Sequence, residues 1–183
     1  MTVTMESAAT PVVALDDLKR YLKISLGDDD ALLGELLRAA TDMAERFTGQ
    51  ILVDRAVAEV MPVTGEWQRL SIRPVRAVTG VVAIPATGAE FALAVEAYAI
   101  DIDRNGDGWV RVVRQGAAAG MGARVRVAYR AGIAADGAGV PEAIRHGIIR
   151  LAGEYHASRD GLEVRPPAAV SALWRPWRRM RLS

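Results

Sequence analysis

Hydrophobic side chains recur at two different spacings along this chain. They follow a helical period of three to four residues over about 14–24, 28–48 and 141–159, and an alternating period of two over much of about 51–130. A helical stripe needs other apolar stripes to cover it, so the helices should pack together. The pattern therefore predicts an α+β fold: a small helical core of two N-terminal helices and one C-terminal helix, with a β-rich insertion.

The predicted helices carry recognisable signals at their ends. Three aspartates at 28–30 provide an N-cap for the longest helix, and Gly49 stands where a left-handed C-cap belongs. Pro141 suits the first position of the last helix, because its ring already holds a helical φ. After Pro166-Pro167, residues 168–174 could add one or two further helical turns.

The β-rich insertion is predicted to contain short strands, because each alternating run is bounded by glycine or proline. The predicted strands span about 55–60, 67–72, 75–84, 98–102, 109–113 and 123–129. Residues 131–141 then form a glycine-rich linker back to helix.

The two ends of the chain differ in composition from the domain between them. Residues 1–13 are small and polar and predict a flexible N-terminal arm, and residues 14–164 form the main domain. Residues 165–183 form a tail with five arginines, two tryptophans and no acid. The chain has 23 basic and 22 acidic residues, so 18 basic and 22 acidic residues lie outside the tail. Arginine and tryptophan are enriched where proteins bind one another, so the tail is predicted to dock onto a partner.

Two other interpretations of the tail stay open at this point. Trp174 and Trp177 could cap the chain's own core while the arginines remain in water. Alternatively, the arginines could grip phosphate while the tryptophans stack on bases, as in a small nucleic-acid-binding protein. The formal net charge of +1 argues against nucleic-acid binding by the whole surface, so such a site would be confined to the tail.

A weak candidate for a metal site lies at Asp101, Asp103, Asn105 and Asp107, which match the first half of an EF-hand loop. Val112 stands at the twelfth position, where that loop requires a bidentate glutamate, and the flanking runs alternate like strands. A polar hairpin turn is therefore the expected structure, and neither a metal nor another cofactor is predicted.

Catalysis is not predicted. The chain has no cysteine, and its two histidines, His146 and His156, do not share one face of a helix. No Gly-x-Ser-x-Gly nucleophile motif occurs. The sequence also shows no signal peptide and no apolar run long enough to span a membrane, so no membrane partner is expected.

Several segments occur in an order known from one protein family. They are LDDLKRYLKI, the long helix ending AERFTGQ, the strand VRVAYRAG, the helix VPEAIRHGIIRLAGEYHASRDG and the tail LWRPWRRMRL. Together they resemble the phage head-tail connector, or adaptor, family, which tailed phages, prophages and gene transfer agents share. The resemblance covers 15–182 and rests on the ordered set, because no single segment is diagnostic.

The resemblance implies a structural role in the neck of a virion or phage-like particle that assembles in the bacterial cytoplasm. Such proteins form a ring of about twelve copies beneath the portal, and DNA passes through the lumen. The implied partners are the portal protein, further copies of the chain itself, a downstream stopper or tail-completion protein, and the passing DNA.

The family's C-terminal segment is thought to engage the portal, and on this chain that role falls on the tail. The implied portal-binding residues are Leu173, Trp174, Arg175, Pro176, Trp177, Arg178, Arg179 and Arg181. The β-rich insertion departs from the simplest members, which are mostly helical, so the resemblance assigns it no role.

Overall fold

The structure, a computed structural model, describes residues 2–113, 123–158 and 166–179. The chain forms two compact units. The β unit comprises Met1–Ala9 and Asp54–Gly132, and the helical unit comprises Thr10–Val53 and Ile133–Ser183. The predicted α+β class is confirmed, and the β-rich insertion forms a compact unit of its own.

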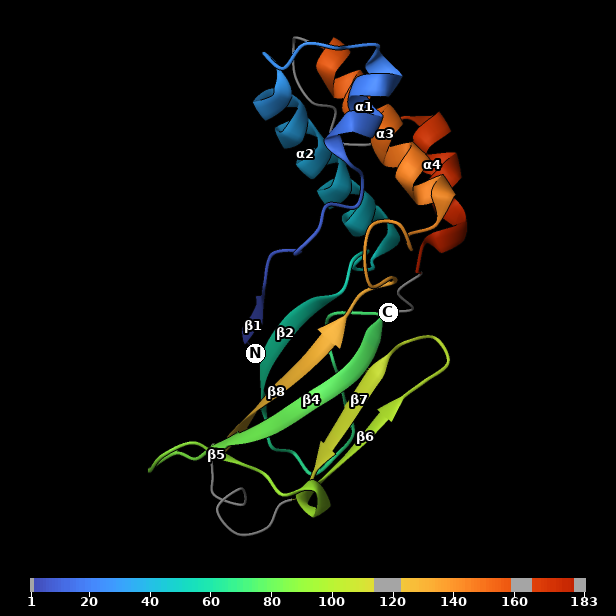
Figure 1. Cartoon of the computed structure of the whole chain (residues 1–183). Helices are drawn as coiled ribbons and strands as arrows, with labels where there is room; N and C mark the ends of the chain where they lie inside the picture. Colours follow the sequence, from blue (N-terminus) through green and yellow to red (C-terminus); the bar gives the residue numbers. More distant parts are fainter. Residues whose placement is uncertain (1, 114–122, 159–165, 180–183) are drawn as a thin grey trace. The chain divides into compact units, whose positions relative to one another are not determined.

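Among the described residues, the helical unit contains the three predicted helices and the further helical turns expected over 168–174 (Figure 1). They are α1 (Leu15–Leu22), α2 (Asp30–Thr48), α3 (Glu142–Ala157) and α4 (Ala168–Trp174), and the 3₁₀ turn η3 (Arg175–Trp177) follows α4. Their shared core consists of fully or almost fully covered side chains from all four α-helices: Leu18, Leu33, Leu37, Ile144, Ile148, Leu151 and Val170. None of the described helices combines the length and apolar character that a membrane span requires.

The ends of α2 agree only partly with the sequence signals. Gly49 adopts the left-handed conformation with φ of 68° and donates its N–H to Glu45 O at 2.9 Å, so the predicted C-cap is confirmed. Asp29 occupies the N-cap position, but its side chain makes no capping hydrogen bond. Asp30 instead pairs with Lys19 of α1, with 2.6 Å between Nζ and Oδ1. That aspartate therefore joins two helices.

The β unit contains two antiparallel sheets. The larger has the order β1-β2-β8-β4-β5 and the smaller the order β3-β7-β6. The strands are β1 (Thr2–Met5), β2 (Arg55–Pro62), β3 (Gln68–Arg69), β4 (Val75–Ile84), β5 (Phe91–Ala92), β6 (Tyr98–Ile102), β7 (Gly108–Val112) and β8 (Arg124–Ala131), and the 3₁₀ turn η1 (Val95–Ala97) precedes β6. Alternate residues of β2, β4, β7 and β8 point into one core between the sheets.

Two strands were not predicted. Thr2–Met5 pairs with β2, so this part of the expected flexible arm at 1–13 is an edge strand. The pairing arises because the outer edge of β2 offers N–H and C=O groups to the extended run TVTM, although all four side chains of that run are exposed. Phe91–Ala92 forms β5 through a pairing of only two residues, which is too short to leave a periodic signal.

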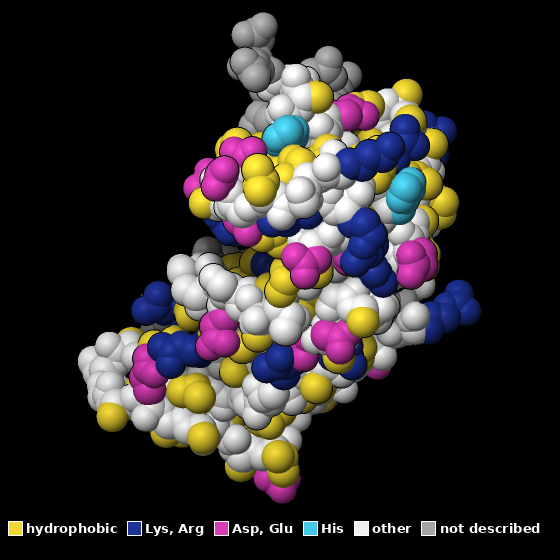
Figure 2. Space-filling model, turned by 45° about the horizontal axis from the view of Figure 1, so that its top comes forward, with side chains coloured by type: hydrophobic (Ala, Val, Ile, Leu, Met, Phe, Trp, Pro, Cys, Tyr) yellow, Lys and Arg dark blue, Asp and Glu magenta, His cyan; other side chains and the backbone are white. Residues whose placement is uncertain are grey.

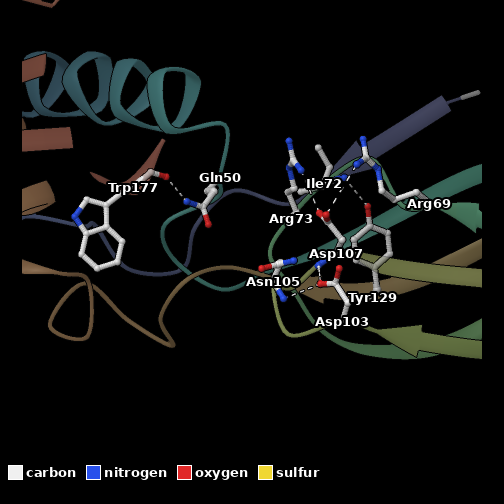
Figure 3. Close-up of polar contacts among 9 residues, drawn as sticks. All are labelled: Gln50, Arg69, Ile72, Arg73, Asp103, Asn105, Asp107, Tyr129 and Trp177. Carbon is white, nitrogen blue, oxygen red and sulfur yellow. Dashed lines mark hydrogen bonds and ion pairs between the residues drawn. The ribbon is translucent and has the colours of Figure 1, made fainter. Parts of the chain in front are cut away.

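A buried carboxylate explains why the predicted strand 67–72 shrinks to two residues. Glu59 of β2 is fully covered, and its oxygens accept hydrogen bonds from Ser71 N–H at 2.9 Å, Ser71 Oγ at 2.7 Å and the Tyr129 hydroxyl at 3.0 Å. The Tyr129 oxygen in turn accepts the N–H of Ile72 at 3.2 Å (Figure 3). Leu70 N–H still donates to Gly108 O of β7 at 2.8 Å, but the N–H groups of Ser71 and Ile72 bond to side chains rather than to a neighbouring strand.

The Tyr129 hydroxyl holds its proton tightly in this setting. Burial raises the pKa of Tyr129 far above its usual range, and the charge of Glu59 adds to the effect. The fold therefore favours the neutral phenol. As the pH rises past about 10, the unfolded chain releases this proton while the folded chain keeps it, so the contribution of Tyr129 to stability falls.

We predict that Tyr129→Phe lowers the free energy of unfolding by about 1–3 kcal/mol at neutral pH, because Glu59 and the Ile72 N–H each lose a partner. The loss of wild-type stability between about pH 9 and pH 11 should be smaller in the variant, which lacks the titrating phenol. Urea unfolding across this range measures both effects. Tyr21→Phe is the matched control, since Tyr21 is 49% exposed. Equal stability of Tyr129→Phe and wild type at neutral pH would contradict the network.

Candidate functional site

The C-terminal segment is held in the helical unit by Trp174, the last residue of α4. The indole is fully buried, and its Nε1–H donates to Ile144 O of α3 at 3.2 Å. Gly147 lies beneath the ring, and a Cβ at that position would overlap the indole. Val170, one turn earlier on α4, is also fully buried. The predicted tail at 165–183 is thus partly built into the core of the helical unit.

Aromatic and cationic side chains continue this contact toward α2. The ring of Phe47 lies 5.8 Å from that of Trp174, centroid to centroid, with an angle of 55° between the planes. On the outside, the guanidinium carbon of Arg178 stands 5.4 Å from the Phe47 centroid. Such a cation–π contact at an exposed site is worth about 0.5–1 kcal/mol. Arg178 is therefore positioned by α2.

Backbone hydrogen bonds fix the turn that follows α4. Arg179 N–H donates to Thr48 O at 2.9 Å, which satisfies one of the carbonyls left open at the end of α2. Gln50 Nε2 donates to Trp177 O at 2.6 Å. Figure 3 shows the Trp177 carbonyl directed at Gln50 and the indole pointing away from it. Trp177 is held by its backbone, so its side chain is available for other contacts.

Four consecutive residues therefore form an exposed surface, which we call the tail surface: Arg175, Pro176, Trp177 and Arg178. Trp177 is 37% exposed, a high value for an indole, because tryptophan is usually covered when a protein has a core available. Leu173 and Arg179 are half-buried, and Arg181 lies outside the described residues.

The structure separates the two tryptophans that the sequence could not distinguish. Trp174 is fully covered by the chain's own helices, as in the core-capping interpretation, whereas Trp177 is not. A single chain does not test portal binding by either residue, but Trp174 offers no free surface. The signal for this difference was the spacing of Val170 and Trp174, which places both on one face of a helix.

Acidic and basic side chains alternate over the face drawn in Figure 2, where dark blue and magenta groups are interspersed. This agrees with a net charge of +1 from 23 basic and 22 acidic residues. Among the described residues of the tail surface there is no acid, so a locally basic site exists on a nearly neutral protein. Such a site favours a local contact with an acidic partner over general adsorption to nucleic acid.

The aspartate-rich segment after β6 forms the predicted hairpin turn. Asp103 Oδ1 accepts the N–H groups of Asn105 at 2.7 Å and Asp107 at 2.9 Å. Asp107 also pairs with Arg73 at 3.1 Å and lies 3.9 Å from Arg69 (Figure 3). The Asp107 carboxylate therefore makes contacts that stabilise the fold. Asp101 lies earlier, on β6 itself, and within the described part of the chain no cluster of three His, Cys, Asp or Glu side chains could hold a metal.

Comparison with known proteins identifies related chains. Residues 13–86 match the family described as "Phage gp6-like head-tail connector protein". A chain in the structure "Neck of empty GTA particle computed with C6 symmetry" is 26% identical with a TM-score of 0.79, and one in "Neck of native GTA particle computed with C12 symmetry" is 26% identical with a TM-score of 0.76. A chain in "Virion of native gene transfer agent (GTA) particle" is 25% identical with a TM-score of 0.78.

Each of these three matches covers 100% of this chain and 98% of the other. The similarity therefore includes the β unit and the helical unit, whereas the family match ends just after β4. No curated protein sequence matches the chain. The resemblance inferred from the ordered segments is confirmed, and the matched family and chains are structural components of particle necks or virions.

We predict that Gly147→Ala lowers the free energy of unfolding by about 1–3 kcal/mol, because its Cβ would enter the space of the Trp174 indole. Gly34→Ala in α2 is the matched control. Its Cβ would meet only the flexible end of Arg38 at 3.6 Å, so helix propensity should raise stability by about 0.5–1 kcal/mol. Urea denaturation of both variants measures the difference. Equal effects of the two substitutions would show that the indole is not seated on Gly147.

Proposed function

We infer that this chain is a head-tail connector of the phage gp6-like kind and that it acts as a structural protein in the neck of a phage-like particle. The observation that carries this inference is the match over 100% of the chain to a chain of a gene transfer agent neck, together with the connector family match over 13–86. A likeness confined to one unit would support only the fold. Here both units are matched, in a protein of nearly the same length.

We propose that the tail surface docks onto the portal. Its exposed indole and two exposed arginines have the composition of a binding hot spot, in which tryptophan supplies rigid apolar area and arginine supplies directed charge. The hydrogen bonds from Gln50 to Trp177 and from Arg179 to Thr48 hold the segment in place before it binds. Such preorganisation reduces the entropy lost on docking.

We propose that the chain assembles as a ring of twelve around the DNA path. One neck that contains a similar chain was computed with C12 symmetry and another with C6 symmetry, which twelve copies also satisfy, and a closed ring of identical subunits repeats one contact between neighbours. The ring would present the same basic tail surface from every copy toward an acidic face of the portal. Its opposite side would meet a stopper or tail-completion protein, and no catalytic step is required at either junction.

A double variant, Arg175→Glu with Trp177→Ala, tests the docking site. We expect its affinity for a portal from the same genome to fall at least about tenfold, because the variant removes the apolar indole of Trp177 and reverses the positive charge of Arg175. Arg175 is exposed and Trp177 is 37% exposed, so the free energy of unfolding should fall by no more than about 1–2 kcal/mol and the variant should stay folded. Biolayer interferometry with immobilised portal measures the affinity.

Arg38→Glu, on the exposed face of α2, is the control for a change of charge elsewhere in the helical unit. Unchanged portal affinity of the double variant would contradict docking through the tail surface. Loss of DNA affinity that is steeply salt-dependent, with portal binding intact, would instead favour a nucleic-acid contact. Deletion of the whole tail is unsuitable, because it also removes the buried Val170 and Trp174.

A further inference from the structure

The outward face of the three-stranded sheet carries two of the chain's four tryptophans. The strand register places Arg69, Trp109 and Asp101 in one row across β3, β7 and β6. The alternation along β7 puts Arg111 on the same side as Trp109, and Arg111 lies over the ring of Trp67, with 5.1 Å between Cζ and the centroid. We call Trp67, Arg69, Trp109 and Arg111 the Trp–Arg face.

This face is not part of the core between the sheets. The other side of β7 points into that core through Val110 and Val112, which are 0% and 1% exposed. In contrast, Trp67 is 41% exposed, the side chain of Arg69 is 49% exposed and Trp109 is half-buried. An outward sheet face normally carries short polar side chains, so two tryptophans there indicate a surface that another protein covers.

The charges on the Trp–Arg face indicate the composition of the surface that would bind it. Arg69 already lies 3.9 Å from Asp107, but within the described residues Arg111 has no ion pair and contacts the Trp67 ring instead. Asp101, on the edge strand β6, is the one acid in these two rows. The complementary surface should therefore combine apolar side chains with carboxylates.

The helical unit carries a surface of that composition at the corner between α1 and α2. Leu26 is 69% exposed and Leu32 is 48% exposed, and Asp28 and Asp29 lie exposed between them. Asp30 is engaged by Lys19, but within the described part of the chain neither Asp28 nor Asp29 has an ion pair. We call Leu26, Asp28, Asp29 and Leu32 the acidic corner.

We propose that the Trp–Arg face of one copy binds the acidic corner of the next copy in the ring. This inference rests on the proposed connector function, because it assigns the contact that repeats around the ring. A ring needs two different patches on each subunit, so that every copy uses one patch toward each neighbour. The two patches lie in different units; both carry exposed apolar side chains, and their charges are opposite.

Charge reversal with rescue tests the contact in the full-length chain. We expect Arg111→Glu, and separately Asp28→Arg with Asp29→Arg, each to lower the fraction of protein in twelve-copy rings at least about tenfold, on the portal or in isolation. The combined triple variant should recover to within about threefold of wild type, because the charges are exchanged rather than lost. Mass photometry counts the copies.

The matched controls are Arg76→Glu on β4 and Asp42→Arg on α2, which reverse exposed charges outside both patches and should leave rings intact. Rings that persist in Arg111→Glu, or a triple variant that is not rescued, would overturn the assignment. Loss of portal or DNA binding by Arg111→Glu with rings intact would assign the Trp–Arg face to that partner instead and would also overturn it. Absence of rings in the wild type with its portal would contradict the connector function itself, before any variant is compared.

Discussion

The C-terminal part of the helical unit depends on the seating of the Trp174 indole against Gly147. Removing a buried tryptophan side chain typically costs about 3–5 kcal/mol, a large share of the roughly 5–15 kcal/mol that stabilise a domain. The indole joins α4 to α3, and Phe47 joins it to α2. The position of the exposed turn that follows is a consequence of this contact. Within residues 166–179, the described part of the predicted basic tail, the segment thus has one side in the core and the other in solvent.

In the β unit, a buried carboxylate rather than a buried aromatic ring joins neighbouring segments of the chain. Glu59 is fully covered and accepts hydrogen bonds from Ser71 and the Tyr129 hydroxyl, so the backbone at Ser71 and Ile72 is fixed by side chains rather than by a strand. A buried carboxylate is costly unless hydrogen bonds satisfy its oxygens, and here three do so. The fixed loop defines where β3 ends, and β3 carries Arg69 of the Trp–Arg face. The stability of this network and the shape of the outer sheet face are therefore linked.

Periodicity predicted the fold class and the helices α1, α2 and α3, because each has an apolar stripe of two or more turns, and in α2 the stripe ends at the clear signal of Gly49. It did not predict β1 or β5, whose pairing depends on the edges of other strands. Residue types alone suggested a docking tail but did not separate Trp174 from Trp177, since that difference depends on the shared helix face of Val170 and Trp174 and on the room that Gly147 of α3 leaves for the indole. The Trp–Arg face was likewise hidden, because strand register decides which side of β7 is buried.

The central claim is that identical copies of this chain form a ring on a portal. Its most direct measurement is the mass gained by a purified portal, from the same genome, when it is mixed with an excess of the wild-type chain. A gain of about 235 kDa, twelve times the 19.6 kDa of one chain, is predicted from the C12 symmetry of the related neck. No gain, or a gain of one or two chains, would contradict the account.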